Sequence, residues 1–515
     1  SSVHAIALRL AFPEAFATQL AARPGEKTFS VKVSSLYRMT PESYDRNIFH
    51  IEFDTRGTDL TYEIGDALGV YGHNDPIQVS RFCKLLGLDG SQLVTALRDE
   101  QCQTRSVHSW LTHALDLFGR PSKKFYAALA EFAADKREAE KLRWLTTAEG
   151  SAEFKSRVAD TTTYADLLAE FTSARPSFLH LVDLIAPIKP RHYSIASSAK
   201  MHPGSVHLCV VSVEWKTCKG ELRAGQCTRF LNSLSIGDRV IVSVKPSVMK
   251  LPPIDSQPVI MAGLGTGMAP FRAFIEERAV RKMQGVDVGP MTLYFGSRHR
   301  AMEYLYGEEL EAYHADGLLT NLRLAFSRDQ KEKVYIQHRM GDDSELLASQ
   351  MLGQDGCFYL CGPTWPASDV KDAMVGAFTT IGGVKPSDAN KVIETLKESE
   401  RYILERIEGR DRREQERKDR AAQASAALAA IPEPELPNKI LFLQGLPVDV
   451  VVSEIEQVFA SCPGYVEVRW VSVKPDVAFV EFEAETQAGA AKAALGSQLV
   501  LREDVAPVSI SFAKR

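Results

Sequence analysis

The segment Arg191-His192-Tyr193-Ser194 carries residue types that suit a flat, charged redox cofactor. In an extended strand, Arg191 and Tyr193 point to one face of the sheet and Ser194 points to the other. A guanidinium beside an aromatic ring fits a flavin nucleotide, because Arg pairs with the pyrophosphate and Tyr lies against the isoalloxazine ring. The hydroxyl of Ser194 suits a hydrogen bond to flavin N5, the atom that accepts hydride. Taken alone, the pattern also fits an ordinary strand.

A glycine turn at Gly225-Gln226-Cys227-Thr228 precedes a helix-like stretch at residues 229–234. The start of a helix presents backbone N–H groups and the positive end of the helix dipole, which favour a phosphate. The pattern therefore predicts a contact with the flavin pyrophosphate. A plain helix start explains it equally well.

A second glycine turn, GLGTGMAPF at residues 263–271, follows a short apolar strand. Gly265, Thr266 and Gly267 lie at its centre, where glycines let the backbone approach a phosphate before a helix begins. The spacing differs from the G-x-G-x-x-G pattern of Rossmann domains. Its position between a strand and a helix nevertheless favours a phosphate site.

Ser327, Arg328, Lys333 and Tyr335 bring two cations and two hydroxyl groups to one loop after a strand. Such a loop fits a 2′-phosphate, the group that separates NADPH from NADH, and a charged surface loop is the alternative. Cys361 ends the next apolar strand, at the carboxyl edge where parallel sheets bind ligands. A small buried residue is the alternative for Cys361.

The elements that position these residues follow from hydrophobic periodicity. Residues 75–175 repeat apolar side chains at helical spacing, whereas the sequence on either side alternates as antiparallel strands do. We therefore expect a β-barrel at residues 29–74 and 176–250, interrupted by a helical connecting insertion. At residues 251–407, apolar strands alternate with helices, which predicts an α/β domain with a parallel sheet. The motifs described above assign FAD binding to the barrel and NADP(H) binding to the parallel sheet.

The remaining segments have other patterns. Residues 1–28 form an N-terminal lead without clear periodicity, and residues 408–436 are a charged, Ala-rich and Pro-ended linker. Residues 437–515 give a β-α-β-β-α-β order, which is typical of a small α+β domain of the ferredoxin-like type.

Composition describes an ordinary globular protein of several domains: 515 residues, 45% hydrophobic and 25% charged, with a net charge of −5. These values exclude collagen-like and disordered classes, and no apolar run is long enough to predict a membrane helix. The eight cysteines contain no Cys-x-x-Cys pair, so we predict no metal site. Scattered cysteines are typical of reduced thiols in a cytoplasmic protein.

The order of the motifs resembles the diflavin branch of the ferredoxin–NADP⁺ reductase superfamily over residues 28–407. DRNIFHIEFD, RHYSIASS, YFGSRHRAMEYLY, FSRDQKEKVYIQH and CGPTWP are most similar to the flavoprotein components of fungal assimilatory NADPH–sulfite reductases. The resemblance implies FAD contacts from Arg191, Tyr193, Ser194 and Gly225–Thr228. It implies NADPH contacts from Thr266, Arg298, Ser327, Arg328, Lys333 and Tyr335. Ser194, Cys361 and Glu405 would line the hydride path.

Two departures from the family bear on function. Ile407 stands where the family places an aromatic residue on the flavin, and no flavodoxin-like FMN domain precedes the barrel. The resemblance therefore implies electron transfer from NADPH through FAD to a separate acceptor, in this family an FMN- and siroheme-bearing sulfite reductase subunit. An NADPH–cytochrome reductase type of electron donor is one alternative. A spliceosomal RNA-binding protein fused to a reductase relic is the other.

Residues 437–515 resemble an RNA-recognition motif (RRM), most closely the second such domain of the spliceosomal A/B-double-prime small nuclear ribonucleoproteins. PNKILFLQGLP, VAFVEFEAETQAGAAKAAL and ISFAKR carry the resemblance. It implies RNA stacking on Phe442 and Phe479, while Val477 replaces a third aromatic. Residues 438–515 hold seven Lys or Arg and ten Asp or Glu, a net charge of −3 that opposes phosphate binding. RNA, a spliceosomal protein partner and a nuclear location remain open.

Overall fold

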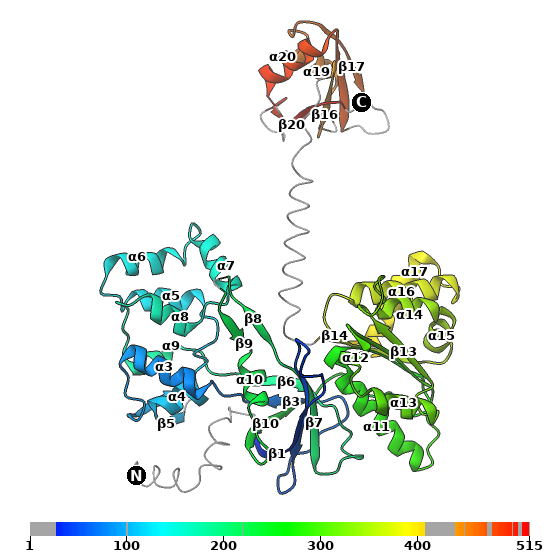
Figure 1. Cartoon of the computed structure of the whole chain (residues 1–515). Coiled ribbons are helices and arrows are strands. Elements are labelled where there is room, and N and C mark those ends of the chain that lie inside the picture. Colours follow the sequence, from blue (N-terminus) through cyan, green and yellow to red (C-terminus); the bar gives the residue numbers. More distant parts are fainter. Residues whose placement is uncertain are drawn as a thin grey trace. The chain divides into compact units, whose positions relative to one another are not determined.

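The structure is a computed structural model that describes residues 27–98, 101–218, 220–406, 438–447, 449–470, 476–496, 498–502 and 507–513. The chain divides into two compact units, residues 1–415 and 416–515 (Figure 1). Most of the N-terminal lead, Ile407 and the linker at 408–436 lie outside the described residues. Among the described residues, no helix combines the length and apolar character needed to cross a membrane.

The predicted antiparallel sheet is present and has six strands in the order β6-β3-β10-β1-β2-β7. Alternate residues of its first strand, Phe29, Val31 and Val33, are buried in the sheet's core. A bridge between Ile195 and Leu208 brings the two edge strands together. The strands are β1 (Phe29–Arg38), β2 (Ile48–Asp54), β3 (Ala67–Val70), β6 (Arg191–Ser194), β7 (Ser205–Val211) and β10 (Arg239–Lys245). A hairpin of β8 (Glu214–Lys216) and β9 (Leu222–Ala224) leads into α10 (Gln226–Asn232).

The insertion is mainly helical, as predicted, and packs around the fully buried Trp110. Its first helix begins at Pro76 after the N-cap Asp75 and ends at Gly87, whose φ of 66° suits a left-handed C-cap. Its helices are α3 (Pro76–Leu86), α4 (Val107–His113), α5 (Lys123–Ala130), α6 (Lys136–Trp144), α7 (Ser151–Ala159), α8 (Tyr164–Glu170) and α9 (Phe178–Leu184). The sequence did not predict the hairpin of β4 (Leu93–Arg98) and β5 (Gln101–Ser106).

The second sheet is parallel and has five strands in the order β13-β12-β11-β14-β15, which places β11 at its centre. Its helices cover both faces: α11 and α13 pack on one and α14 to α17 on the other. The strands are β11 (Val259–Leu264), β12 (Met291–Ser297), β13 (Asn321–Phe326), β14 (Cys357–Gly362) and β15 (Tyr402–Arg406). The helices are η1 (Gly265–Met268), α11 (Ala269–Met283), α12 (Arg300–Glu303), α13 (Gly307–Ala315), α14 (Ile336–Asp342), α15 (Ser344–Ala348), η2 (Ser349–Gly353), α16 (Ala367–Thr380) and α17 (Pro386–Glu398).

The two sheets of the first unit share one apolar core. Ile48, Cys209 and Met249 from the antiparallel domain lie in the same buried cluster as Phe271 and Phe274 of α11. Burial of this joint surface stabilises their contact. The carboxyl ends of the parallel strands can therefore be held against the antiparallel sheet.

The second unit has the β-α-β-β-α-β order expected of an RRM, with a short strand added before the last one. Its sheet order is β17-β18-β16-β20-β19. The core is formed by residues such as Leu441, Phe459 and Val480. The elements are β16 (Ile440–Gln444), α19 (Val452–Phe459), β17 (Tyr465–Trp470), β18 (Val477–Phe482), α20 (Glu485–Leu495), β19 (Gln498–Leu499) and β20 (Val508–Phe512).

Candidate active site

Ser194, Cys361 and Glu405, predicted from different parts of the sequence, meet where the two sheets of the first unit touch. Ser194 is the last residue of β6, and its hydroxyl donates a hydrogen bond to Oε2 of Glu405 at 3.3 Å. Glu405 lies on β15, directly opposite Cys361 of β14 in the parallel register. The Ser194 hydroxyl also interacts with the Cys361 thiol. This contact joins the flavin segment to the parallel sheet.

Burial raises the pKa of both acidic groups at this junction. Burial raises the pKa of Glu405, and the nearby Ser194 hydroxyl and Lys245 oppose that shift. Cys361 has no exposed surface, and burial together with the Glu405 carboxylate raises the pKa of its thiol well above the usual value. Cys361 is therefore a neutral thiol at physiological pH and lacks the thiolate of a nucleophilic cysteine.

Arg191 and Tyr193 present different surfaces on β6. Arg191 is exposed, whereas the ring of Tyr193 is partly exposed with its hydroxyl end buried against Cys227. Burial raises the pKa of Tyr193, so its phenol stays neutral. Asp116 of the insertion faces Arg191, and burial raises the pKa of that carboxyl while Arg191 opposes the shift. An exposed guanidinium beside a half-exposed ring matches the needs of a flavin nucleotide.

The turn before α10 has the features of a phosphate cradle. Gly225 occupies the N-cap without a capping side chain, and Thr228 follows in the first turn. Nε2 of Gln226 is buried and has no hydrogen-bond partner among the described residues. At Gly72, an added Cβ would lie 3.0 Å from Cα of Cys227, so the neighbouring backbone passes close by. The orphaned amide donor and the uncapped N–H groups fit an anionic cofactor such as FAD.

The glycines of the second turn serve two separate purposes. Gly265 has a φ of +56°, which glycine adopts without strain, and an added Cβ there would meet nothing within 4 Å. At Gly267, in contrast, a Cβ would lie 2.1 Å from the carbonyl oxygen of Cys361. Gly267 therefore permits close packing of the turn on β14, whereas the partly exposed Thr266 is free to face a ligand.

The predicted NADPH residues gather at the carboxyl edge of the parallel sheet. The backbone N–H of Arg328 donates to the carbonyl of Arg298 at 2.9 Å, and that of Ser327 donates to the carbonyl of Ser297 at 3.0 Å. These bonds join the loops that follow β12 and β13. Arg328 and Lys333 are exposed and form no ion pair within the described part of the chain.

Tyr335 caps the start of α14, and its ring packs edge-on against Trp365 with centroids 5.6 Å apart. Trp365 follows β14, the strand that ends in Cys361 and Gly362. The loop predicted to bind the 2′-phosphate thus contacts the segment that follows β14, the strand that carries the buried thiol. The exposed cations of this loop, Arg328 and Lys333, fit a phosphate dianion.

Three residues that hold the Arg298 loop carried no predicted role. Glu303 is 1% exposed and accepts hydrogen bonds from the Tyr44 hydroxyl and Arg46 Nη1, each at 2.7 Å. Its other oxygen accepts from the backbone N–H of Arg298 at 3.2 Å. The only signal in the sequence was position: Tyr44, Arg46 and Glu303 all lie in or beside the segments that resemble the reductases.

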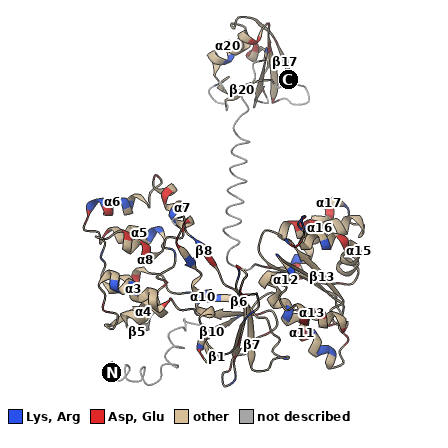
Figure 2. Ribbon diagram, viewed as in Figure 1, with Lys and Arg blue, Asp and Glu red and all other residues tan. Residues whose placement is uncertain are grey.

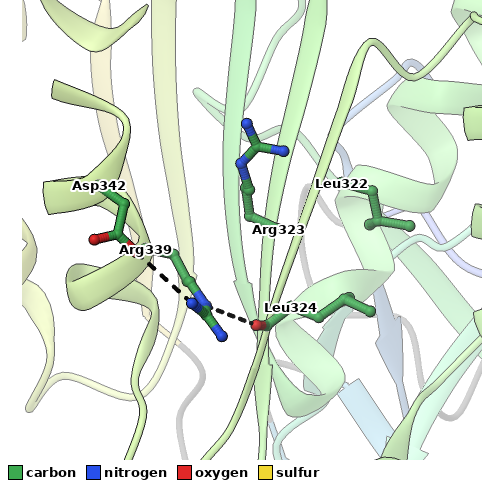
Figure 3. Close-up of a pocket in the computed structure, with 5 residues that line it drawn as sticks. All are labelled: Leu322, Arg323, Leu324, Arg339 and Asp342. Carbon is green, nitrogen blue, oxygen red and sulfur yellow. Dashed lines mark hydrogen bonds and ion pairs between the residues drawn. The ribbon is translucent and has the colours of Figure 1, made fainter. Parts of the chain in front are cut away.

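Figure 3 shows a pocket of about 310 Å³ at the free edge of the parallel sheet, away from the predicted site residues. Its charges are already paired: Arg323 binds Asp343, while Arg339 contacts Asp342 and donates to the carbonyl of Leu324. The pocket lies along the edge strand β13, where these charged side chains oppose pairing with another strand. It does not extend the predicted cofactor site.

On the second unit, Phe442 and Phe479 lie opposite each other on β16 and β18, with ring centroids 5.2 Å apart. Both are partly exposed, whereas Val477 is buried. Glu481 of the same sheet pairs with Lys439 and Arg469. Figure 2 shows where basic and acidic residues lie along the ribbon of this unit. The structure therefore keeps the aromatic pair that RNA stacking needs and neutralises the cations beside it.

Comparisons with known proteins identify the domains of the chain. Residues 23–230 match the FAD binding domain, residues 261–371 match the oxidoreductase NAD-binding domain, and residues 441–504 match the RNA recognition motif. The "Sulfite reductase [NADPH] flavoprotein component" of Saccharomyces cerevisiae is 46% identical over 415 residues, which are 79% of this chain and 40% of that protein. Its probable counterpart in Schizosaccharomyces pombe is 44% identical over 411 residues, covering 79% of this chain and 41% of that protein.

The NADPH–cytochrome P450 reductase of Cavia porcellus is 34% identical over 388 residues, covering 72% of this chain and 57% of that protein. The chain thus spans about two fifths of the sulfite reductase components that it matches. The chain thus combines an FAD binding domain and an oxidoreductase NAD-binding domain, which are homologous to sulfite reductase flavoprotein components, with an RNA recognition motif.

Proposed function

We propose that the chain is an NADPH-dependent flavoprotein reductase that passes electrons through FAD to a separate acceptor protein. The observation that carries the proposal is the Ser194–Glu405 hydrogen bond, with Cys361 beside it. It joins the β6 segment, whose Arg and Tyr suit a flavin, to the sheet whose loops suit NADPH. The named relatives that use NADPH support the same choice of dinucleotide.

Each cofactor has its own set of residues in this proposal. Arg191, Tyr193, Ser194 and the Gly225–Thr228 turn would hold FAD. Thr266, Arg298, Ser327, Arg328, Lys333 and Tyr335 would hold NADPH. FAD, when bound, accepts a hydride from NADPH and releases electrons one at a time.

The residues at the junction orient the reacting rings and manage a proton. Ser194 holds the carboxyl group of Glu405 through its hydroxyl, and burial raises the pKa of Glu405, so this group keeps a proton more readily than an exposed carboxyl does. The neutral Cys361 thiol lies beside Ser194 and Glu405 and adds no charge to the site. Fixed geometry at this point is the protein's main contribution to hydride transfer.

For the acceptor, we propose the FMN- and siroheme-bearing subunit of an assimilatory sulfite reductase, because the relatives of 44–46% identity are sulfite reductase components. An acceptor of the cytochrome type is the second candidate, supported by the 34% identical P450 reductase. The eight cysteines are all free, which fits the reducing cytoplasm that we expect for this reaction.

The test is anaerobic stopped-flow mixing of the FAD-loaded chain with NADPH, followed by ferricyanide. We expect about one FAD per chain, no FMN, flavin bleaching by NADPH and reduction of ferricyanide. Sulfide should form only after a siroheme-bearing subunit is added. Stoichiometric FMN in acid extracts, or failure of NADPH to bleach bound FAD, would contradict the proposal.

For the second unit, we propose weak binding of single-stranded RNA through the neighbouring rings of Phe442 and Phe479. The partly exposed rings support stacking, and the pairing of Lys439 and Arg469 with Glu481 keeps phosphate attraction low. Fluorescence titration with short RNA oligomers tests it. RNA binding that survives the double substitution Phe442→Ala and Phe479→Ala would contradict the role of these rings. A spliceosomal protein would then replace RNA as the partner proposed for this aromatic surface.

A further inference from the structure

His50, Glu52 and His207 form a compact cluster that has no part in the proposed FAD or NADPH sites. His50 and Glu52 lie two residues apart on β2, and His207 is the direct register partner of Glu52 on β7. Nε2 of His50 lies 3.3 Å from Oε1 of Glu52, and Nε2 of His207 lies 3.8 Å from its Oε2. Within this cluster one ligand atom from each residue lies within 4.8 Å of the others.

We propose that this cluster is a binding site for a divalent transition metal, with Zn²⁺ the best fit. Two imidazoles and one carboxylate are a known ligand set for zinc that leaves the fourth position to water. Tetrahedral zinc with bonds of about 2.0–2.2 Å places its ligand atoms roughly 3.3–3.6 Å apart. The two measured separations already approach that value, so small side-chain movements suffice to close the site.

The surroundings orient the His50 ring toward Glu52, whereas Nε2 of His207 also lies 3.1 Å from Oγ of Ser205. The Tyr306 hydroxyl lies 2.9 Å from Nδ1 of His50, and the ring of Tyr37 stacks on His50 with centroids 5.0 Å apart. This leaves Nε2 of His50 directed at the carboxylate, as a metal ligand requires. His50 and His207 are buried, whereas the Glu52 side chain is 31% exposed and gives an ion access from solvent.

The charges near the cluster leave the Glu52 carboxylate available to a cation. Arg272 lies 3.5 Å from Nδ1 of His207, but its guanidinium is already bonded to Glu276 at 2.8 Å and to Glu309 at 3.1 Å. Two carboxylates therefore already offset the charge of Arg272. A cation held by Glu52 and the two imidazoles meets a carboxylate that is not paired with this guanidinium.

The position of the site gives the ion a structural consequence. Its three ligands lie on the antiparallel sheet, while Tyr306 and Arg272 reach it from the domain that carries the parallel sheet. A bound ion would tighten β2 and β7 beneath this contact. We therefore expect occupancy to raise the unfolding temperature of the first unit.

The experiment is calorimetric titration of the chelator-treated, FAD-loaded full-length chain with Zn²⁺ alone. The background carries Cys102→Ser and Cys218→Ser, because both thiols are exposed. We expect one ion per chain, and Glu52→Gln or His207→Gln should each weaken binding at least about 10-fold. His202→Gln is the matched control, because its ring lies 4.4 Å from that of His207 but its Nε2 contacts Glu276.

Spectra and stability provide a second readout. Co²⁺ in place of Zn²⁺ should give visible d–d bands in the difference spectrum of the control variant and lose them in Glu52→Gln. FAD content and thermal unfolding without metal check that each variant folds. Absence of Zn²⁺ binding in the parent chain, or equal affinity in Glu52→Gln, His207→Gln and the control, would overturn the proposal.

Discussion

Replacing Gly267 by Ala tests whether hydride transfer depends on the packing of the glycine turn against β14. The new Cβ would lie 2.1 Å from the carbonyl oxygen of Cys361 and 2.7 Å from its carbonyl carbon. Both atoms are backbone, and β14 is hydrogen-bonded to β11 on one side and β15 on the other. The turn and the strand must therefore separate by about 1 Å, since Cβ contacts shorter than 3.0 Å are essentially unknown.

A displacement of about 1 Å at a reacting group costs roughly 100-fold in rate, or about 2.7 kcal/mol in activation free energy. Cys361 moves with the strand, and the ladder passes the shift to Glu405. We expect Gly267→Ala to slow NADPH-driven bleaching of FAD about 100-fold in stopped-flow mixing. FAD content should stay normal, because the proposed flavin residues lie on the antiparallel sheet and α10.

Substitutions at two other glycines distinguish the effect of the close Cβ contact from the effect of backbone conformation. Gly376 lies in α16, where an added Cβ would meet nothing within 4 Å, so Gly376→Ala should stabilise the helix by up to about 1 kcal/mol and leave the rate unchanged. Gly265→Ala meets no atom but must adopt a φ of +56°, which costs roughly 1–2 kcal/mol. A Gly267→Ala rate within twofold of the parent, in a folded protein, would refute the reasoning.

Three further outcomes follow from the structure. Arg328→Ala should weaken NADPH binding about 30–150-fold, the cost of a charged contact of about 2–3 kcal/mol, and leave NADH nearly unchanged in steady-state assays. Burial lowers the pKa of His73 to about 4, so its neutral form stabilises the fold above pH 6.5 and that stability is lost as the pH falls toward 4. Between pH 7 and 5 His73 contributes at most about 2 kcal/mol to the loss of stability, and His73→Phe should reduce the loss measured in urea unfolding by that amount. Glu481→Gln should release Lys439 and Arg469, strengthen RNA binding and steepen its dependence on salt.

Local sequence patterns predicted the architecture because each pattern has a local physical cause. The alternation of Phe29, Val31 and Val33 reflects a strand with one face in the core, and the structure confirms it. The hairpin in the insertion was missed although Val94 and Ala96 are buried in alternation. Leu93 and Leu97 are exposed and masked this alternation. A strand is recognised by apolar residues that alternate with polar ones, and apolar residues on the solvent face remove that alternation.

The candidate site was also predicted only in part. The residue types of Ser194, Cys361 and Glu405 were visible in the sequence, but their meeting depends on a contact between residues 211 positions apart. The reason for Gly267 was also hidden, because the sequence indicated space for a phosphate and the structure shows space for the Cys361 carbonyl. Such contacts are decided by tertiary packing, which a single sequence does not display.

Glu303 shows that the contact between the two domains and the shape of the dinucleotide loop are one feature. Its carboxylate is almost fully buried, and its partners Tyr44 and Arg46 come from the segment between β1 and β2 of the antiparallel sheet. A buried carboxylate is costly unless such partners are present. The same group fixes the backbone N–H of Arg298, so the loop proposed to contact NADPH keeps its form only while the antiparallel sheet is docked. Under the proposed assignment, the antiparallel domain therefore also shapes the loop that would contact NADPH.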